Sequence, residues 1–272
     1  MKSSKRNLHF IQIIGLALGL LWIAPFFLMV INAFKTKAEI FTDVIALPET
    51  LSLANFVEAF IELDFIRSFL NSLLITVISV GLIIVFSSMA GYALARNKSK
   101  LSSILFFMFV AAMLIPFQSV MIPLVSNFGQ FEMLNRVGLI FMYIGFGCSL
   151  SIFLYHGAMT GISTSLDEAA IIDGANRFQL FWHIIFPLLK PISVTVGILN
   201  VIWIWNDFLL PSLVLKSEAA TIPLQMFMFF GQYTRQWHLA LAGLTLAILP
   251  VVIGYFFAQK QIIKGVSEGA VK

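Results

Sequence analysis

Residues 167–177 read Asp-Glu-Ala-Ala-Ile-Ile-Asp-Gly-Ala-Asn-Arg, a polar, helix-forming stretch in an otherwise apolar chain. Ala169 and Ala170 give the expected helix a nearly bare face, which another backbone can approach closely. Gly174 can adopt the left-handed conformation that ends a helix. The stretch therefore predicts a short, small-surfaced helix followed by a tight turn.

The residues on both sides extend this prediction to a helix–turn–helix elbow. Ser165 precedes Glu168 by three residues, which is the spacing of a capping box and predicts where the first helix begins. Asn176 can cap a second helix. The apolar residues of that helix fall at i, i+3, i+4 and i+7: Phe178, Phe181, Trp182 and Ile185. Pro187 and Pro191 follow at the entry to an apolar run, where a kink is tolerated.

The composition places the chain in a membrane. Of its 272 residues, 60% are apolar and only 11% are charged, with a mean hydropathy of +0.96. A soluble domain carries roughly a quarter charged residues. The single cysteine, Cys148, excludes an intrachain disulfide and gives no sign of a thiol site or metal cluster.

Six stretches are long enough to cross a hydrocarbon core of about 30 Å, which takes about 20 apolar residues as helix. The first is longer than the core of a cleavable signal peptide and is followed by five more, so we expect it to be retained. The predicted spans are residues 9–33, 68–93, 102–125, 138–159, 188–210 and 239–259. We expect an all-α polytopic protein with one membrane domain, residues 1–272.

The distribution of Lys and Arg predicts the orientation. With six spans both termini share a side, and that side carries eleven of the seventeen Lys and Arg residues. The positive-inside rule then makes both termini cytoplasmic. The net charge of +4 reflects this topology and gives no evidence for nucleic-acid binding.

The order of acid, paired alanines, glycine and prolines in residues 160–187 closely resembles the signature loop of ABC-importer permeases. In that family the elbow is a coupling helix that docks in a groove of a cytoplasmic ATPase. The resemblance implies ATPase-coupling roles for these residues: Glu168, Ala169, Ala170, Asp173, Gly174 and Arg177.

Further stretches are similar to the second permease subunit of maltose- and multiple-sugar-type importers. They are Asn71-Ser72, Gly91–Ala93, Trp203–Phe208, Phe257–Lys260 and Gly269–Lys272. The resemblance covers most of residues 68–272, with a permease core at about 68–260 and a cytoplasmic tail at 260–272. It implies a type I ABC importer permease fold and a tail that contacts the ATPase through Gly265, Gly269 and Lys272.

A possible substrate path lies on the fifth predicted span, where polar and aromatic residues share a helix: Asn200, Trp203, Asn206 and Asp207. Of these, Asn200, Trp203 and Asp207 are expected on one helix face, at i, i+3 and i+7. Aromatic faces and amides are groups that a sugar can contact, and polar groups inside lipid usually face a cavity or another helix. Two structural alternatives stay open. Tryptophan near a span end is typical of the interfacial belt, and asparagine often bridges helices.

The sequence contains no Gly-Lys dipeptide and therefore no phosphate-binding loop of the G-x-x-x-x-G-K-[ST] type. We expect no enzymatic activity and no cofactor bound by this chain, with ATP and Mg used by a partner ATPase. The four histidines show no metal-ligand spacing, so no metal site is predicted.

The resemblance implies the subunit of an oligosaccharide importer in the bacterial cytoplasmic membrane, surrounded by membrane lipid and without nucleic acid. Its expected partners are a homologous second permease, two ATPase subunits and an extracytoplasmic sugar-binding protein. The alternatives are a secondary transporter or channel for small polar solutes, which needs an intramembrane charge relay or ion site, and a polytopic membrane enzyme.

Overall fold

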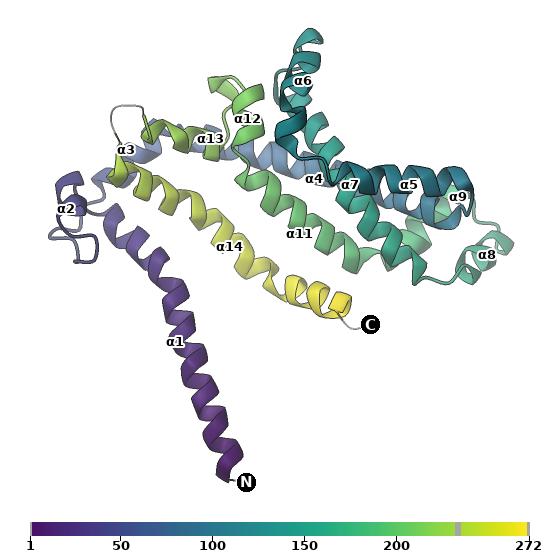
Figure 1. Cartoon of the computed structure of the whole chain (residues 1–272), viewed down its shortest axis with the longest axis horizontal. Coiled ribbons are helices and arrows are strands. Elements are labelled where there is room, and N and C mark those ends of the chain that lie inside the picture. Colours follow the sequence, from purple (N-terminus) through teal and green to yellow (C-terminus); the bar gives the residue numbers. More distant parts are fainter. Residues whose placement is uncertain (1, 232–234, 271–272) are drawn as a thin grey trace. The chain divides into compact units, whose positions relative to one another are not determined.

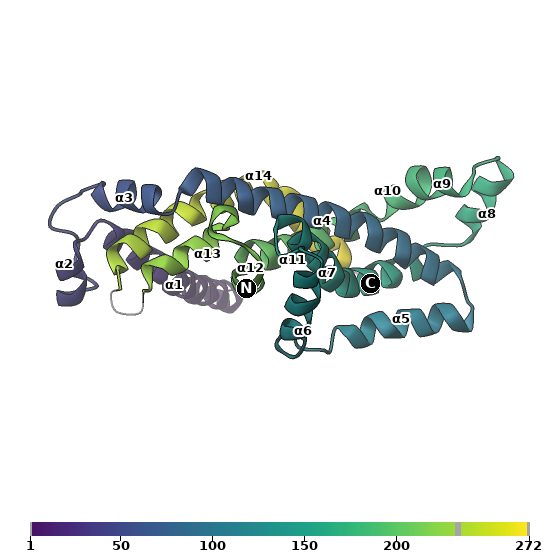
Figure 2. The same ribbon diagram turned by 90° about the horizontal axis from the view of Figure 1, so that it is seen from above.

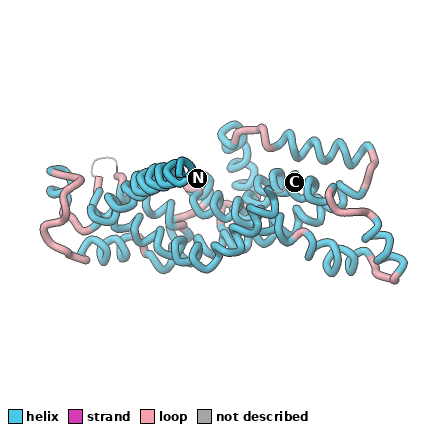
Figure 3. Tube along the Cα trace, turned by 90° about the horizontal axis from the view of Figure 1, so that it is seen from below, coloured by secondary structure: helices cyan, strands magenta, loops and turns pink. Residues whose placement is uncertain are grey.

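The computed structural model describes residues 2–231 and 235–270. Within these residues the regular elements are helices joined by loops, without strands (Figure 3). The chain forms two compact units, Met1–Ile66 with Gln225–Gly254, and Arg67–Leu224 with Tyr255–Lys272. One domain over residues 1–272 stays a prediction.

The first unit is built around the end of the first long helix. Its elements are α1 (Lys2–Ala33), α2 (Lys37–Thr42), α3 (Ala54–Glu62), the last two residues of α13 (Ile222–Met226), a 3-10 helix (Phe227–Phe229) and the first part of α14 (Trp237–Ala270). The Lys35 side chain is buried, and its ammonium donates to the carbonyl oxygen of Asp43 over 2.9 Å. The Asn55 amide donates to the carbonyl oxygens of Ala33 and Lys35, both over 2.8 Å. These bonds hold the connection between α1 and α3 against the end of α1.

The second unit contains the predicted elbow and the helices that lead to and from it (Figure 1). They are α4 (Phe65–Arg96), α5 (Lys100–Ala112), α6 (Phe117–Gln130), α7 (Arg136–Thr160), α8 (Ser165–Ile172), α9 (Arg177–Gln179), a π-helix (Leu180–Ile185), α10 (Phe186–Leu188), α11 (Lys190–Asn206), α12 (Leu209–Val214) and a 3-10 helix (Ser217–Ala219). Where α4 passes α7, a Cβ atom on Gly91 would lie 2.6 Å from the Cβ atom of Tyr155. Only glycine permits this close approach.

Among the described residues, four helices are long and apolar enough to cross a membrane without a break. They are α1 over Ile11–Ala33, α4, α7, and α14 over Trp237–Gly254. They confirm the predicted spans 9–33, 68–93, 138–159 and 239–259, and with them the all-α polytopic fold class. The cytoplasmic location of both termini stays a prediction.

The other two predicted spans are not continuous helices. Residues 102–125 divide into α5 and α6, which are bent by 102° (Figure 2). Pro116 directly precedes α6 and, without an N–H group, cannot continue the α5 hydrogen-bond pattern. Residues 188–210 contain a bend of 75° before α11, whose second residue is Pro191, and α11 ends at Asn206. If each bent pair is one broken span, residues 2–231 and 235–270 contain six spans.

Candidate functional site

The predicted elbow is present as α8, a turn, and the helical arm from α9 to α10. Figures 1 and 2 show α8 at one extremity of the second unit, the same extremity at which α4 is connected to α5. The turn follows the local prediction. Gly174 has φ +84°, and the N–H of Ala175 donates to the carbonyl oxygen of Ala170 over 2.9 Å. This bond satisfies a carbonyl group at the end of α8.

The two arms begin differently from each other. The predicted capping box at the start of α8 is wrong, because Thr164 precedes the helix without a side-chain cap and Ser165 lies within it. The hydroxyl of Ser165 instead lies 2.8 Å from that of Ser163. The prediction for the second arm is confirmed. Asn176 accepts from the N–H of Gln179 over 2.9 Å, and the Gln179 side chain accepts from the Asn176 N–H over 3.0 Å.

The predicted coupling residues do not share one surface. Most of them are exposed: Glu168, Ala169, Asp173, Gly174 and Arg177. Ala170 is only 5% exposed and packs into the apolar core with Leu180 and Phe181. A common bare face of Ala169 and Ala170 is therefore wrong, because consecutive residues of an α-helix point about 100° apart. Ala170 supports the elbow from inside.

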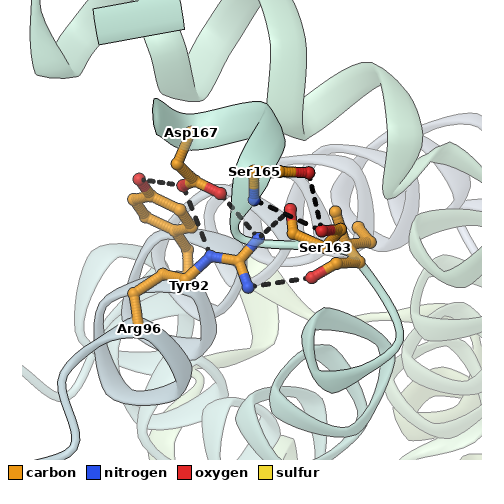
Figure 4. Close-up of polar contacts among 6 residues, drawn as sticks. Tyr92, Arg96, Ser163, Ser165 and Asp167 are labelled. Atoms are coloured by element: carbon orange, nitrogen blue, oxygen red, sulfur yellow. Dashed lines mark hydrogen bonds and ion pairs between the residues drawn. The ribbon is translucent and has the colours of Figure 1, made fainter. Parts of the chain in front are cut away.

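Asp167, which is not among the predicted coupling residues, anchors α8 to the end of α4 (Figure 4). Its Oδ2 atom lies 2.8 Å from Nη2 of Arg96, and the two side chains are 12% and 16% exposed. Its Oδ1 atom accepts from Arg96 Nε over 3.3 Å and from the Tyr92 hydroxyl over 2.9 Å. We call this cluster of Tyr92, Arg96 and Asp167 the latch. Its sequence signal is a tyrosine and an arginine one helical turn apart at the end of an apolar span.

Asn200 forms a bridge between helices. It is 5% exposed, and its amide donates to Ser151 Oγ over 3.1 Å and to the carbonyl oxygen of Val196 over 2.9 Å. A Cβ atom on Gly147 of α7 would lie 2.7 Å from Asn200 Oδ1. In this structure Asn200 therefore joins α11 to α7, which is the structural alternative that the sequence left open.

The remaining predicted path residues cluster at the end of α11. Trp203 is 40% exposed and contacts the buried ring of Tyr143 edge to face, with ring centroids 5.4 Å apart. The Tyr143 hydroxyl donates to Asp207 Oδ2 over 2.9 Å. Asp207 has extended backbone angles and lies beyond α11, so the predicted common helix face of Asn200, Trp203 and Asp207 is wrong. Asn206 is exposed, with its amide bonded to its own helix.

The tail prediction falls largely outside the region where side chains are described. Gly265 and Gly269 lie in the helical backbone of α14, and Lys272 lies outside the described residues. Among the residues that the structure describes, no three or more His, Cys, Asp or Glu side chains are grouped to hold a metal ion.

Comparison with known proteins identifies the family. Residues 83–268 match the family described as binding-protein-dependent transport system inner membrane component. The chain is 54% identical, over 97% of its length and 97% of the relative's, to the "Probable starch degradation products transport system permease protein AmyC" of Thermoanaerobacterium thermosulfurigenes. It is 34% identical, over 98% of both chains, to the "Melibiose/raffinose/stachyose import permease protein MelC" of Bacillus subtilis.

Solved structures agree with this assignment. The fold is similar to a chain of a bacterial ABC transporter involved in the import of the acidic polysaccharide alginate, with a TM-score of 0.78 and 25% identity, covering 94% of this chain and 97% of the other. A chain of the MetNI methionine ABC transporter shares the fold at a TM-score of 0.56 and 17% identity, covering 74% and 95% of the two chains. The protein therefore belongs to the family of binding-protein-dependent transport system inner membrane components, multi-pass proteins of the bacterial plasma membrane.

Proposed function

We propose that this chain is a transmembrane subunit of an ATP-driven ABC importer for oligosaccharides. The printed names of the relatives support the substrate class, because they describe transport of starch degradation products and of melibiose, raffinose and stachyose. The chain lines half of the translocation path. A homologous permease lines the other half, and an extracytoplasmic binding protein delivers the sugar.

The elbow docks a cytoplasmic ATPase. The observation that carries this proposal is the exposure of Glu168, Ala169, Asp173 and Gly174 on an elbow whose inner side is fixed to α4. A short helix with a small residue and acidic groups on its free side can enter a groove of a partner. Two ATPase subunits bind ATP and Mg, and this chain holds no cofactor and is not an enzyme. Closure of the ATPases moves the elbow and switches the cavity from inward-open to outward-open. The C-terminal tail, residues 260–272, is a second contact for the ATPase, through Gly265, Gly269 and Lys272.

Residues at the end of α11 contact the sugar directly. The partly exposed indole of Trp203 and the carboxylate of Asp207 both contact Tyr143, and Asn206 is exposed on the last turn. A sugar can place its C–H face on the indole and its hydroxyls on the polar groups. Asn200 is left out of this set because its amide is already bonded between two helices.

Two substitutions at Gly174 test the docking. No heavy atom lies within 4 Å of a Cβ atom built there, so the space around the turn is open within this chain. Gly174→Trp adds bulk to the exposed surface and strains the left-handed turn. Gly174→Asn is the matched control, because asparagine accepts this conformation. We expect Gly174→Trp to reach the membrane in normal amount but to recover less ATPase on purification and to import less labelled maltotriose and raffinose.

The Asn variant should retain both activities better than the Trp variant. Normal recovery of the ATPase and normal uptake by Gly174→Trp would contradict the docking. Uptake by the reconstituted chain without any ATPase, driven by a proton or sodium gradient, would instead favour the secondary transporter.

A further inference from the structure

The latch joins three elements of the second unit. Tyr92 and Arg96 project from the last two turns of α4 and reach Asp167 in the first turn of α8. Arg96 Nη1 also donates to the carbonyl oxygen of Ile162 over 3.0 Å, in the connection that follows α7. One arginine therefore holds the end of α4, the exit of α7 and the start of the elbow together (Figure 4).

The second arm of the elbow also contacts α4, through the ring of Tyr92. The ring centroids of Tyr92 and Phe181 are 5.5 Å apart, and Phe181 lies in the π-helix that follows α9. The Tyr92 hydroxyl meantime bonds to Asp167 of α8. Both arms of the elbow thus rest on one tyrosine at the end of α4.

The chemistry of the latch makes it directional. The guanidinium group is planar and presents its N–H donors in a fixed fork, so its bonds to Asp167 set an orientation as well as an attraction. Both charged side chains are largely shielded from water. Loss of either partner leaves the other charge without compensation in a poorly solvated site.

The neighbouring acid has the opposite environment. Glu168 is exposed, although it directly follows Asp167 in the same helix turn. Of two consecutive carboxylates, one is bonded inside the chain and the other is free for a partner. The proposed docking uses the exposed Glu168 and gives no role to Asp167.

We propose that Arg96, Asp167 and Tyr92 are positioning residues that fasten the elbow to the end of α4, so that a displacement of the elbow is delivered to α4 as one body. That ATPase subunits displace the elbow is part of the proposed function, and this inference rests on it to that extent. The fastening itself is a property of this chain alone, and the two are tested separately.

The first experiment measures the fastening in the isolated full-length chain in nanodiscs. A spin label is attached to Ile172→Cys, at the exposed end of α8, in a Cys148→Ser background. Arg96→Glu should make the label at least about twice as mobile in its electron paramagnetic resonance spectrum. Lys98→Glu is the matched control, since it reverses an exposed charge two residues further on. The double variant Arg96→Glu with Asp167→Arg should restore the original mobility.

Equal mobility in Arg96→Glu and Lys98→Glu would overturn the proposal. A double variant as mobile as Arg96→Glu alone would also overturn it, because the loss would then belong to the contact of Arg96 with Ile162 and not to the pair. A Tyr92→Phe variant removes one hydrogen bond but keeps the ring contact, so its label should be intermediate in mobility.

The second experiment measures the consequence in the assembled importer. Arg96→Glu should lower the ratio of sugar transported to ATP hydrolysed by about tenfold, within the range of the coupling between two sites, and the double variant should recover it. A residue that merely supports folding would lower the amount of complex and leave this ratio unchanged, and that outcome would overturn the positioning role. If the wild-type chain recovers no ATPase, the proposed function fails, while the mobility measurement still decides the latch.

Discussion

Replacing Gly91 with alanine should weaken the packing of α4 on α7. The added Cβ atom would lie 2.6 Å from the Cβ atom of Tyr155 and 3.1 Å from the backbone nitrogen of His156. Both atoms are fixed by the backbone of α7 and cannot move aside by rotating a side chain. Overpacking of this kind costs about 1–3 kcal/mol. Alanine also favours helix over glycine by about 0.8–1.0 kcal/mol, so the net effect of a single variant is smaller than the clash.

A control on the same helix isolates the clash. Gly81 also lies in α4, and a Cβ atom built there meets no heavy atom within 4 Å. Gly81→Ala gains the same helix propensity without the collision. The difference between the two variants is therefore about 1–3 kcal/mol, or roughly a 5- to 150-fold difference in their unfolding equilibrium constants.

The measurement is equilibrium unfolding of the purified chain in mixed micelles, followed by tryptophan fluorescence as the denaturing detergent fraction increases. Gly91→Ala should unfold at a lower fraction than wild type, and Gly81→Ala at an equal or higher one. Coincident unfolding curves for the two variants would refute the close approach of α4 and α7 at this position.

Two further predictions concern α11. Asn200→Leu removes the bond to Ser151 of α7, and a bond between membrane helices is worth about 0.6 kcal/mol. Stability should therefore fall by about that amount, while the apparent affinity for imported sugar stays unchanged. An altered affinity would return Asn200 to the substrate path. Trp203→Phe keeps an aromatic contact with Tyr143 but removes the indole, so the uptake KM for labelled maltotriose should rise by about threefold, as expected for part of a stacking contact worth about 1 kcal/mol; an unchanged KM would confine Trp203 to packing.

The sequence predicts the membrane helices well because span length and apolar content are local quantities. It does not predict which prolines bend the chain. Pro116 stands at a bend of 102°, whereas Pro123 lies inside α6 and Pro25 inside α1. A proline removes one hydrogen bond wherever it occurs, but neighbouring groups decide whether the helix then bends. Those neighbours come from distant parts of the chain.

In the candidate site, too, the sequence predicts what consecutive residues decide and misses what distant residues decide. The left-handed Gly174 and the cap at Asn176 follow from the conformations of a few consecutive residues, and both are present. The inward direction of Asp167 depends on Arg96, which is 71 residues away in the sequence. No pattern within the loop distinguishes Asp167 from Glu168. Asp207, which lies beyond the end of α11 and off the predicted helix face, combines a local with a distant contact: its carboxylate accepts from the N–H of Leu209 and from the hydroxyl of Tyr143.

Residues 167–170 of α8 divide between a buried and an exposed side, and this connects the latch with the proposed docking. Asp167 and Ala170 are three positions apart, lie on one face of α8 and are buried, whereas Glu168 and Ala169 between them are exposed. A helix of only eight residues thus has an anchored face and a free face. A partner that pushes on the free face acts on a body already bonded to α4 through Arg96, so the shortness of α8 becomes an advantage. A longer, unanchored helix would absorb the displacement by bending or by moving on its own.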